Sequence, residues 1–411
     1  MKILRLLIIF LSFFLIAITG IAQKKAKKTL FIIVDGIAAD VLERVETPHI
    51  DLISKDGAYT RAYLGGEKGG YSETPTISAV GYNSLLTGTW ANKHNVWDNE
   101  IEAPNYHYWT IFRFLNEQYP EKKTAVFSTW LDNRTKLIGE GLPQNRNLKL
   151  DFIFDGLELD TVNFPHHDEF YIQKIDEKVT EKATSTIKED GPDLNWVYLQ
   201  FTDNTGHQYG DSPENDKAVK VIDRQVGQIY NAVKYREQNF NEEWLVFVTT
   251  DHGRKASDGK GHGGQSEREK TIWISTSLKN PNKYFYSNKP AIVDIFPTIA
   301  EHMGIEIPRE HKMELDGVSL VKNISISHPE ARIIGDELVI SWEAFASDEN
   351  VKIWLAETNE FKTSGKMDNY QLVGEVPILK QQYIIPLKKR KVNFYKIVIE
   401  GKNNMVNRWV N

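Results

Sequence analysis

Three runs of hydrophobic residues in the chain each end on an aspartate. The runs are 30–35, 196–203 and 244–251, and they end on Asp35, Asp203 and Asp251. A short, continuously apolar run is typical of a strand that is buried on both faces, and such strands form parallel sheets. In open α/β sheets, ligands bind beyond the carboxyl ends of the strands. The three aspartates are therefore predicted to meet at one edge of a parallel sheet.

The pattern up to about residue 305 alternates between strands and helices. Short apolar runs predict strands over 58–63, 124–128 and 271–276, and apolar residues at helical spacing predict helices over 108–119, 213–233 and 292–303. This alternation indicates a doubly wound α/β domain, with helices on both faces of a mostly parallel sheet. Segment 140–170 has little periodicity, and we interpret it as an insertion near the mouth of the site.

The pattern changes from about residue 325. Strands separated by polar turns, with no helix between them, are predicted at 332–334, 337–342, 351–355, 382–386 and 393–399. Short strands at this spacing predict an antiparallel β-sandwich, and the spacing resembles that of a fibronectin type III module. We therefore predict two domains, over residues 23–324 and 325–411.

The first 22 residues have the features of a secretory signal peptide. Lys2 and Arg5 form a basic start, an apolar stretch follows from Leu6 to Thr19, and small residues end the segment at 20–22. The apolar stretch is short for a membrane span, so we expect cleavage rather than an anchor. The mature protein is predicted to be periplasmic or secreted, with no membrane span.

Composition excludes several classes of protein. The chain has no cysteine, which rules out disulfides and the cysteine-derived formylglycine nucleophile that most sulfatases use. Its formal charge is −6, and removal of Lys2 and Arg5 with the signal peptide brings it to −8. A modestly acidic chain shows no nucleic-acid-binding surface, which needs a concentrated basic face.

Three histidines accompany the three aspartates. They are His207, His252 and His262, each next to or near a glycine. Each of the six residues alone would more often be a cap, turn or packing residue. Together they divide into Asp35, Asp251 and His252 for one metal ion, and Asp203, His207 and His262 for another. Carboxylate and imidazole ligands suit Zn²⁺, and two such ions can hold the attacking and leaving oxygens of a phosphoryl displacement.

A serine at a predicted helix start is the candidate nucleophile. The segment from Ser78 looks helical and ends at Thr87 and Gly88. The helix dipole and direct coordination of the Ser78 oxygen to a metal would both favour its alkoxide form. Two alternatives stay open: Ser78 is only an N-cap, or Thr74 or Thr76 carries the reactive hydroxyl.

At this point the chain resembles the alkaline phosphatase superfamily, in particular its nucleotide pyrophosphatase/phosphodiesterase and phosphate-irrepressible phosphatase branches. The matching motifs lie within residues 29–305: Val34-Asp35-Gly36, Ser84-x-x-Thr87-Gly88, Asn99, Asp203-x-x-x-His207, Asp251-His252-Gly253 and Gly261-His262-Gly263. The resemblance implies two zinc ions and a covalent phospho-enzyme. It also implies that Ser78, ten residues before Gly88, is the nucleophile and that Asn99 holds a phosphoryl oxygen.

Two departures from the family pattern bear on the substrate. The nucleophile is Ser where these branches usually carry Thr, and only Arg134 matches the Lys-x-Arg pair that grips a dianionic monoester. Asp132 stands where the Lys is expected, which disfavours a doubly charged substrate. Arg134→Ala should then cripple monoester turnover and barely touch diester turnover. Alternatively, Asp132 and Arg134 simply pair on a loop.

The sequence therefore predicts a phosphodiesterase that acts on a small phosphate ester. A phosphomonoesterase is the second choice, and a surface glycan-binding protein that uses residues 325–411 is the non-enzyme alternative. Four aromatic residues near the predicted site could stack on a base or a sugar, although core packing is expected for most of them. They are Tyr82, Trp90, Trp97 and Trp130.

Overall fold

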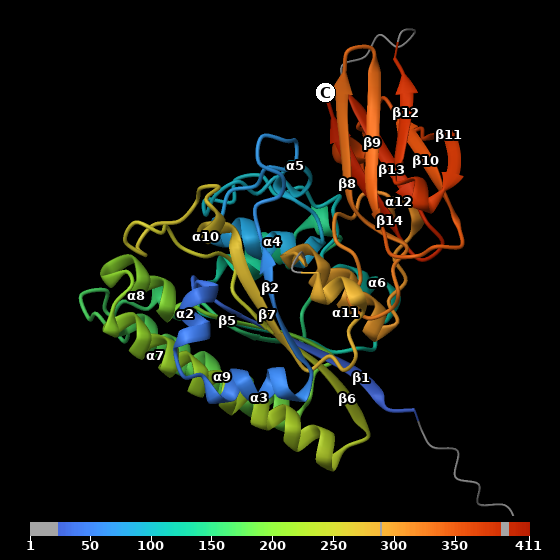
Figure 1. The fold of residues 1–411 in the computed structure, drawn as a ribbon. Coiled ribbons are helices and arrows are strands. Elements are labelled where there is room, and N and C mark those ends of the chain that lie inside the picture. The colour runs from blue at the N-terminus through green and yellow to red at the C-terminus, as the bar shows by residue number, and fades with distance from the viewer. Residues whose placement is uncertain (1–23, 288–289, 388–393) are drawn as a thin grey trace, which may run out of the picture.

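The computed structural model describes residues 24–287, 290–387 and 394–411 (Figure 1). The predicted signal peptide lies outside these ranges. Within them, no helix has the length and apolar character needed to cross a membrane.

A seven-stranded sheet forms the centre of the larger part of the molecule, in the order β2-β7-β6-β1-β5-β3-β4. Its strands are β1 (Ala26–Val34), β2 (Ala58–Tyr63), β3 (Thr124–Ser128), β4 (Phe152–Phe154), β5 (Leu194–Leu199), β6 (Glu242–Thr249) and β7 (Thr271–Thr276). Strand β1 pairs in parallel with both β5 and β6, and only the β2 and β7 pairings are antiparallel. The predicted, mostly parallel sheet is confirmed, and the 140–170 segment contributes its edge strand β4.

Helices cover both faces of this sheet (Figure 1). One face carries α2 (Ala39–Arg44), α3 (Pro48–Asp56), α7 (Tyr171–Glu189), α8 (Phe201–Tyr209) and α9 (Pro213–Asn239). The other carries α4 (Ser78–Thr87), α6 (Ile111–Gln118) and α11 (Ile295–Met303). Alternate residues of β1 enter opposite cores, because successive side chains of a strand point to opposite faces. Ile32 lies in one core and Phe31 and Ile33 in the other, which explains the uninterrupted apolar run.

The C-terminal part folds into two antiparallel sheets, ordered β11-β10-β13-β14 and β12-β9-β8. Their strands are β8 (Ile326–Ile334), β9 (Glu337–Ala344), β10 (Asn350–Ala356), β11 (Gln371–Pro377), β12 (Gln382–Pro386), β13 (Tyr395–Glu400) and β14 (Met405–Val410). The predicted β-sandwich is confirmed, while the domain boundary stays a prediction. The expectation of no helix is wrong, because α13 (Glu360–Ser364) follows β10. The Asp368 carboxylate, eight residues further on, accepts the Glu360 amide and so fixes the start of α13.

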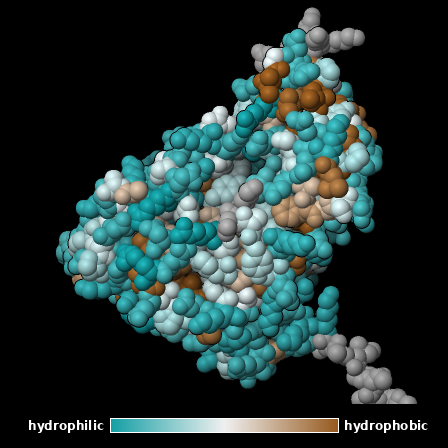
Figure 2. Space-filling model, viewed as in Figure 1, coloured by the Kyte–Doolittle hydropathy of each residue, from teal (hydrophilic) through white to brown (hydrophobic). Residues whose placement is uncertain are grey.

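Figure 2 shows a largely hydrophilic surface with several apolar patches over this C-terminal module. The exposed apolar side chains of the module include Ile334, Leu372, Leu379 and Ile384. Isolated exposed apolar residues are normal on a soluble surface and need no functional explanation.

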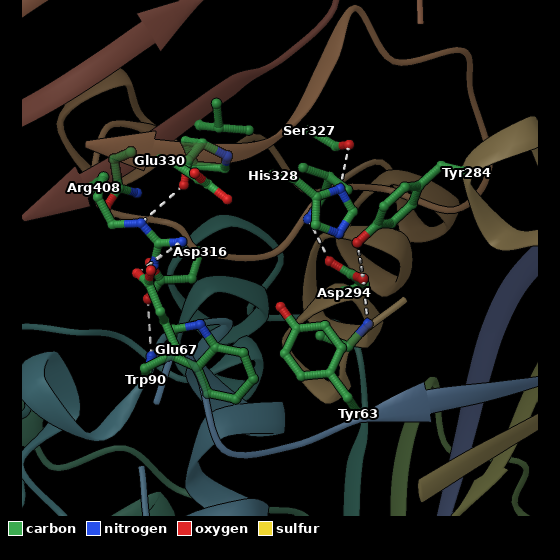
Figure 3. Close-up of a pocket in the computed structure, with 15 residues that line it drawn as sticks. Tyr63, Glu67, Trp90, Tyr284, Asp294, Asp316, Ser327, His328, Glu330 and Arg408 are labelled. Atoms are coloured by element: carbon green, nitrogen blue, oxygen red, sulfur yellow. Dashed lines mark hydrogen bonds and ion pairs between the residues drawn. The ribbon is translucent and has the colours of Figure 1, made fainter. Parts of the chain in front are cut away.

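Buried charges join the module to the α/β domain. On α5 (Ala91–His94), the Lys93 ammonium donates to Asp316 at 2.6 Å and to Asn407 of β14 at 2.6 Å. The Lys396 ammonium is fully buried between Asp368, at 2.7 Å, and Glu314. Figure 3 shows a neighbouring part of this junction, a cavity of about 160 Å³ lined by residues of both parts.

The buried cluster predicts a large stability effect. Lys396→Ala should lower the free energy of unfolding by about 3–5 kcal/mol, because it leaves buried carboxylates without their cation. Arg309→Ala is the matched control, since the Arg309–Glu400 ion pair crosses the same junction on the surface and should contribute about 1 kcal/mol or less. Urea unfolding of both variants measures the difference. Equal losses of unfolding free energy in the two variants would contradict the interpretation that burial makes the Lys396 ion pairs more stabilising than a surface pair.

Candidate active site

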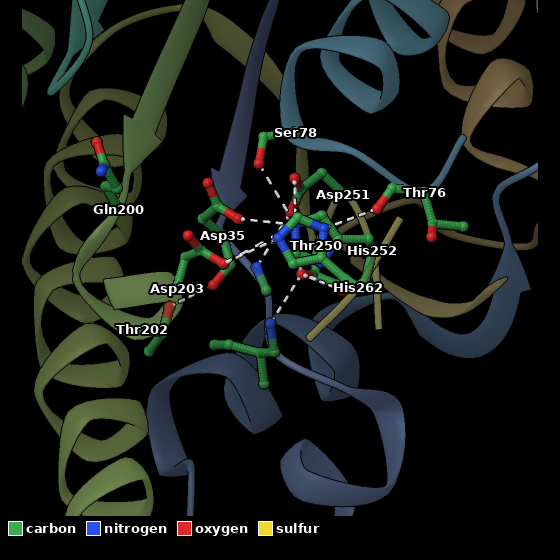
Figure 4. A network of polar contacts seen from close by, with 12 residues as sticks. Asp35, Thr76, Ser78, Gln200, Thr202, Asp203, Thr250, Asp251, His252 and His262 are labelled. Atoms are coloured by element: carbon green, nitrogen blue, oxygen red, sulfur yellow. Dashed lines mark hydrogen bonds and ion pairs between the residues drawn. The ribbon is translucent and has the colours of Figure 1, made fainter. Parts of the chain in front are cut away.

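The carboxyl ends of three adjacent strands bring the predicted aspartates together (Figure 4). Asp35 directly follows β1, Asp203 lies in the first turn of α8 after β5, and Asp251 comes two residues after β6. Because β5, β1 and β6 are neighbours in the sheet, the three carboxylates converge as the sequence pattern predicts. Their side chains are buried or nearly so.

Two compact groups of ligand atoms form around these carboxylates. One contains Asp203, His207 and His262, and the other contains Asp35, Asp203 and His252, with all ligand atoms of each group within 4.8 Å of one another. The sequence analysis assigned Asp251 to the group that contains Asp35 and His252, whereas the structure places Asp203 in that group. Asp251 still lies beside this group, because its Oδ2 is 3.3 Å from His252 Nε2. Asp203 thus lies between the two predicted metal positions.

Unpartnered polar atoms test whether these residues fit metal ions. Asp35 Oδ1 and Asp251 Oδ2 are buried and accept no hydrogen bond among the described residues, although each lies 3.3 Å from His252 Nε2, which can pair with them only when the ring is protonated. The Nδ1 atoms of His252 and His262 lie 2.9 and 2.8 Å from backbone carbonyl oxygens, which leaves both Nε2 atoms facing the cluster. Buried carboxylates and oriented imidazoles of this kind are costly without a cation, so the residues fit divalent metal binding.

The carboxylates also perturb one another's protonation. Burial and the Asp35 charge raise the pKa of Asp251 well above its usual range, and they raise the pKa of Asp203 as well. Burial alone would lower the pKa of His252, but the charges of Asp251 and Asp35 raise it to about 9. The cluster therefore attracts positive charge, as a proton on His252 or as bound cations.

Of the three candidate nucleophiles, Ser78 is the one whose hydroxyl contacts this cluster. It is 6% exposed, it is the first residue of α4, and its Oγ lies 3.4 Å from His252 Nε2. The N-cap alternative is wrong, because the N-cap position is Ile77. The rival hydroxyls have other partners: Thr74 donates to the Ser72 carbonyl and Thr76 to the Gly264 carbonyl.

The side chain of Asn99, a residue outside helix α4, contacts the start of that helix. Its Oδ1 accepts the backbone N–H of Ala79, the residue after Ser78, at 3.0 Å. This contact leaves the amide NH₂ group of Asn99 as a donor on an exposed side chain beside Ser78. The position is compatible with a contact to a phosphoryl oxygen, which remains a prediction.

The sequence interpretation missed the residues that hold the ligands in place. Arg254 is 1% exposed and donates to Asp203 Oδ1 at 2.6 Å and to the Gly36 carbonyl at 3.0 Å. Gly36 has a φ of +67°, and a Cβ there would lie 2.4 Å from the Arg254 guanidinium, so only glycine fits. The only signal for Arg254 in the sequence is its place directly after Asp251-His252-Gly253.

Two tyrosine hydroxyls donate hydrogen bonds to Asp35. The Tyr198 hydroxyl donates to Asp35 Oδ2 at 2.6 Å, and the Tyr82 hydroxyl donates to the same atom. Although burial raises the pKa of Asp35, these bonds and His252 together hold it well below the usual range. Tyr82 therefore has a polar contact at the site as well as the core packing expected for it, since it is fully buried.

Arg134 has carboxylate partners in the structure. Its guanidinium contacts Asp155 at 2.6 Å and Glu140 at 2.6 Å, while Asp132 pairs with Lys136 at 2.9 Å. The alternative that Asp132 and Arg134 pair with each other is therefore wrong. Substrate binding by Arg134 remains a prediction, and it would require the guanidinium to share or release one of these carboxylates.

Comparisons with known proteins agree with this geometry. Residues 29–302 match the family model described as type I phosphodiesterase / nucleotide pyrophosphatase. The chain belongs to this family. Its membership confirms the resemblance to the alkaline phosphatase superfamily that the motifs predicted.

Individual relatives of this phosphodiesterase family member are distant. Human ectonucleotide pyrophosphatase/phosphodiesterase family member 7 is 23% identical over 306 residues, which cover 71% of this chain and 59% of the relative. A 2,3-bisphosphoglycerate-independent phosphoglycerate mutase of Mesoplasma florum is 27% identical over 133 residues, or 32% of this chain and 24% of the mutase. The structure of human ectonucleotide pyrophosphatase/phosphodiesterase 5 shares the fold, with a TM-score of 0.50, 14% identity and coverage of 69% of this chain and 96% of that one.

The Tyr198 contact predicts an effect on metal affinity. Tyr198→Phe should weaken Zn²⁺ binding about 10–100-fold, because the hydroxyl orients Asp35 and offsets its charge. Competition with a chelator of known affinity measures this change. Tyr63→Phe is the control, since Tyr63 lines the junction cavity and, in the part of the chain that the structure describes, its hydroxyl donates to no metal-site residue. Unchanged Zn²⁺ affinity in Tyr198→Phe would contradict the interpretation that this hydroxyl orients Asp35 for metal binding.

Proposed function

We propose that this protein is a periplasmic or secreted two-metal phosphohydrolase that prefers phosphodiesters and forms a covalent phosphoserine intermediate. The observation that carries the proposal is the Ser78 Oγ, 3.4 Å from His252 Nε2, at the edge of the Asp/His cluster. Family membership supports phosphodiester chemistry. The predicted signal peptide at 1–22 supports export from the cytoplasm.

The residues of the chain would act as follows. Ser78 Oγ gives its proton to water and attacks phosphorus, the bond from phosphorus to the leaving alkoxide breaks, and the alkoxide takes a proton back from water. Water then cleaves the Ser78–phosphorus bond and restores the hydroxyl. The Asn99 amide and the amino end of α4 stabilise the charge on the non-bridging oxygens. Two bound divalent ions, Zn²⁺ by ligand type, would supply Lewis acidity at Ser78 and the leaving group.

The charge around Arg134 favours diesters over monoesters. Asp132 stands where a second cation would grip a dianion, and the Arg134 guanidinium is already paired with Glu140 and Asp155. A monoester dianion brings one more negative charge than a diester does, and these residues offer it no unpaired cation. Phosphomonoester hydrolysis is therefore the second choice. A purely glycan-binding role would not explain why the buried oxygens Asp35 Oδ1 and Asp251 Oδ2 accept no hydrogen bond from the described residues.

Paired kinetics test the proposed reaction. The zinc-loaded protein should have a kcat/KM for bis-p-nitrophenyl phosphate at least about tenfold above that for p-nitrophenyl phosphate. Ser78→Ala should lose about 10³-fold or more and should no longer trap labelled phosphate on acid quenching. Thr74→Ala is the control, because its buried hydroxyl donates to the Ser72 carbonyl rather than to the cluster. Full activity in Ser78→Ala would contradict the proposed mechanism, and a preference for the monoester would contradict the proposed substrate.

Arg134→Ala tests the predicted dianion contact. If Arg134 grips the substrate, monoester kcat/KM should fall about tenfold or more while the diester value changes by about twofold or less. Loss of the ion pairs with Asp155 and Glu140 should also lower the melting temperature. A lower melting temperature with equal changes in kcat/KM for both esters would show that Arg134 stabilises the local structure and does not contact the substrate.

A further inference from the structure

A second pocket lies where the α/β domain meets the C-terminal module. Its volume is about 380 Å³. Tyr71, Asn92 and Trp97 line it from the α/β domain, while Asn359, Lys362, Phe394 and Trp409 line it from the module. None of these residues belongs to the Asp/His cluster, so the reaction proposed above does not account for the pocket.

The aromatic residues give the pocket fixed apolar walls. Tyr71, Phe394 and Trp409 pack edge to face, with ring centroids 5.5–6.2 Å apart and interplanar angles of 70–83°. Trp97 is 42% exposed, and its indole N–H donates to Asn95 Oδ1 at 3.2 Å, which fixes the ring. Core packing, the explanation expected for most aromatic residues near the site, does not account for Trp97, whose partly exposed ring forms a wall of the pocket.

The polar residues of the pocket have unused hydrogen-bonding capacity. Asn92 is only 6% exposed, and its Oδ1 has no hydrogen-bond partner among the described residues. Asn359 Oδ1 accepts a long 3.4 Å bond from Lys396, which leaves its NH₂ group as a donor. Among the described residues no ion pair of the Lys362 ammonium is found, and burial, with no charged partner to oppose it, lowers its pKa. A buried, unpartnered amide and an unpaired ammonium together indicate a ligand with hydroxyl groups and a negative charge.

We propose that this junction pocket binds a sugar ring that carries an acidic substituent. The apolar face of a pyranose stacks on an aromatic ring, its hydroxyls match the amides of Asn92 and Asn359, and its carboxylate, sulfate or phosphate pairs with Lys362. A nucleobase fits less well. A neutral base leaves the Lys362 ammonium unpaired and offers fewer hydroxyl groups to the two amides.

The pocket shares a chain segment with the candidate active site. Trp97 lies two residues before Asn99, whose Oδ1 accepts the Ala79 N–H at the start of α4. The acidic sugar therefore has two sources: it is part of the hydrolysed substrate, or it belongs to a separate glycan that holds the enzyme in place. Sugar binding itself does not depend on the proposed hydrolysis.

Direct binding tests the pocket without turnover. In the full mature chain carrying Ser78→Ala, tryptophan fluorescence and saturation-transfer NMR follow titrations with D-glucuronate, D-glucose and adenosine. Glucuronate should bind about tenfold more tightly than glucose, because only glucuronate pairs with Lys362. Trp97→Ala should weaken both sugars, and Lys362→Met should abolish the preference for glucuronate. Tyr235→Ala is the matched control, since Tyr235 is 40% exposed on α9 and should change nothing.

Three results would overturn the proposal. They are no binding of glucuronate, an unchanged preference for glucuronate in Lys362→Met, and adenosine binding that depends on Trp97 and is tighter than glucuronate binding.

The source of the sugar follows from kinetics of the wild-type protein on p-nitrophenyl phosphodiesters of glucuronate and of glucose. A lower KM for the glucuronate ester that is lost in Trp97→Ala places the ring in the substrate. Trp97-dependent binding with equal KM values identifies a separate glycan, and either result supports an acidic-sugar pocket.

Discussion

Three carboxylates buried at one edge of a sheet impose the constraint on which the rest of the site depends. Asp35, Asp203 and Asp251 follow adjacent strands, and like charges this close in a poorly hydrated interior repel one another unless positive charge is present. His252 and Arg254 supply part of that charge from the protein. The remaining oxygens are free to bind cations, so the stability of this edge of the sheet is linked to metal binding.

The surrounding framework limits how far these carboxylates can move. Arg254 connects Asp203 with the Gly36 carbonyl, and Tyr198 and Tyr82 hold Asp35 from the other side. Such contacts fix ligand orientation before any ion or substrate arrives, which reduces the reorganisation required on binding. The site is therefore built on strand ends and helix starts, where these contacts hold the side chains in place.

One of the segments that contact the C-terminal module also reaches the surroundings of Ser78. Lys93 on α5 bonds to Asn407 of the module, and a few residues later Asn99 reaches the start of α4, next to Ser78. The same segment presents Trp97 to the junction pocket. The module thus packs against a part of the α/β domain that also shapes the surroundings of the nucleophile.

The sequence by itself determined the parallel sheet, the convergence of Asp35, Asp203 and Asp251, and the family, because apolar periodicity and local motifs record which residues are buried and where strands end. Only the tertiary structure decided the contacts between distant segments. Arg254 reaches Gly36 across 218 positions, and Lys93 reaches Asn407 across 314. No local pattern encodes such partners, since they depend on how separate elements pack once their apolar faces have been buried.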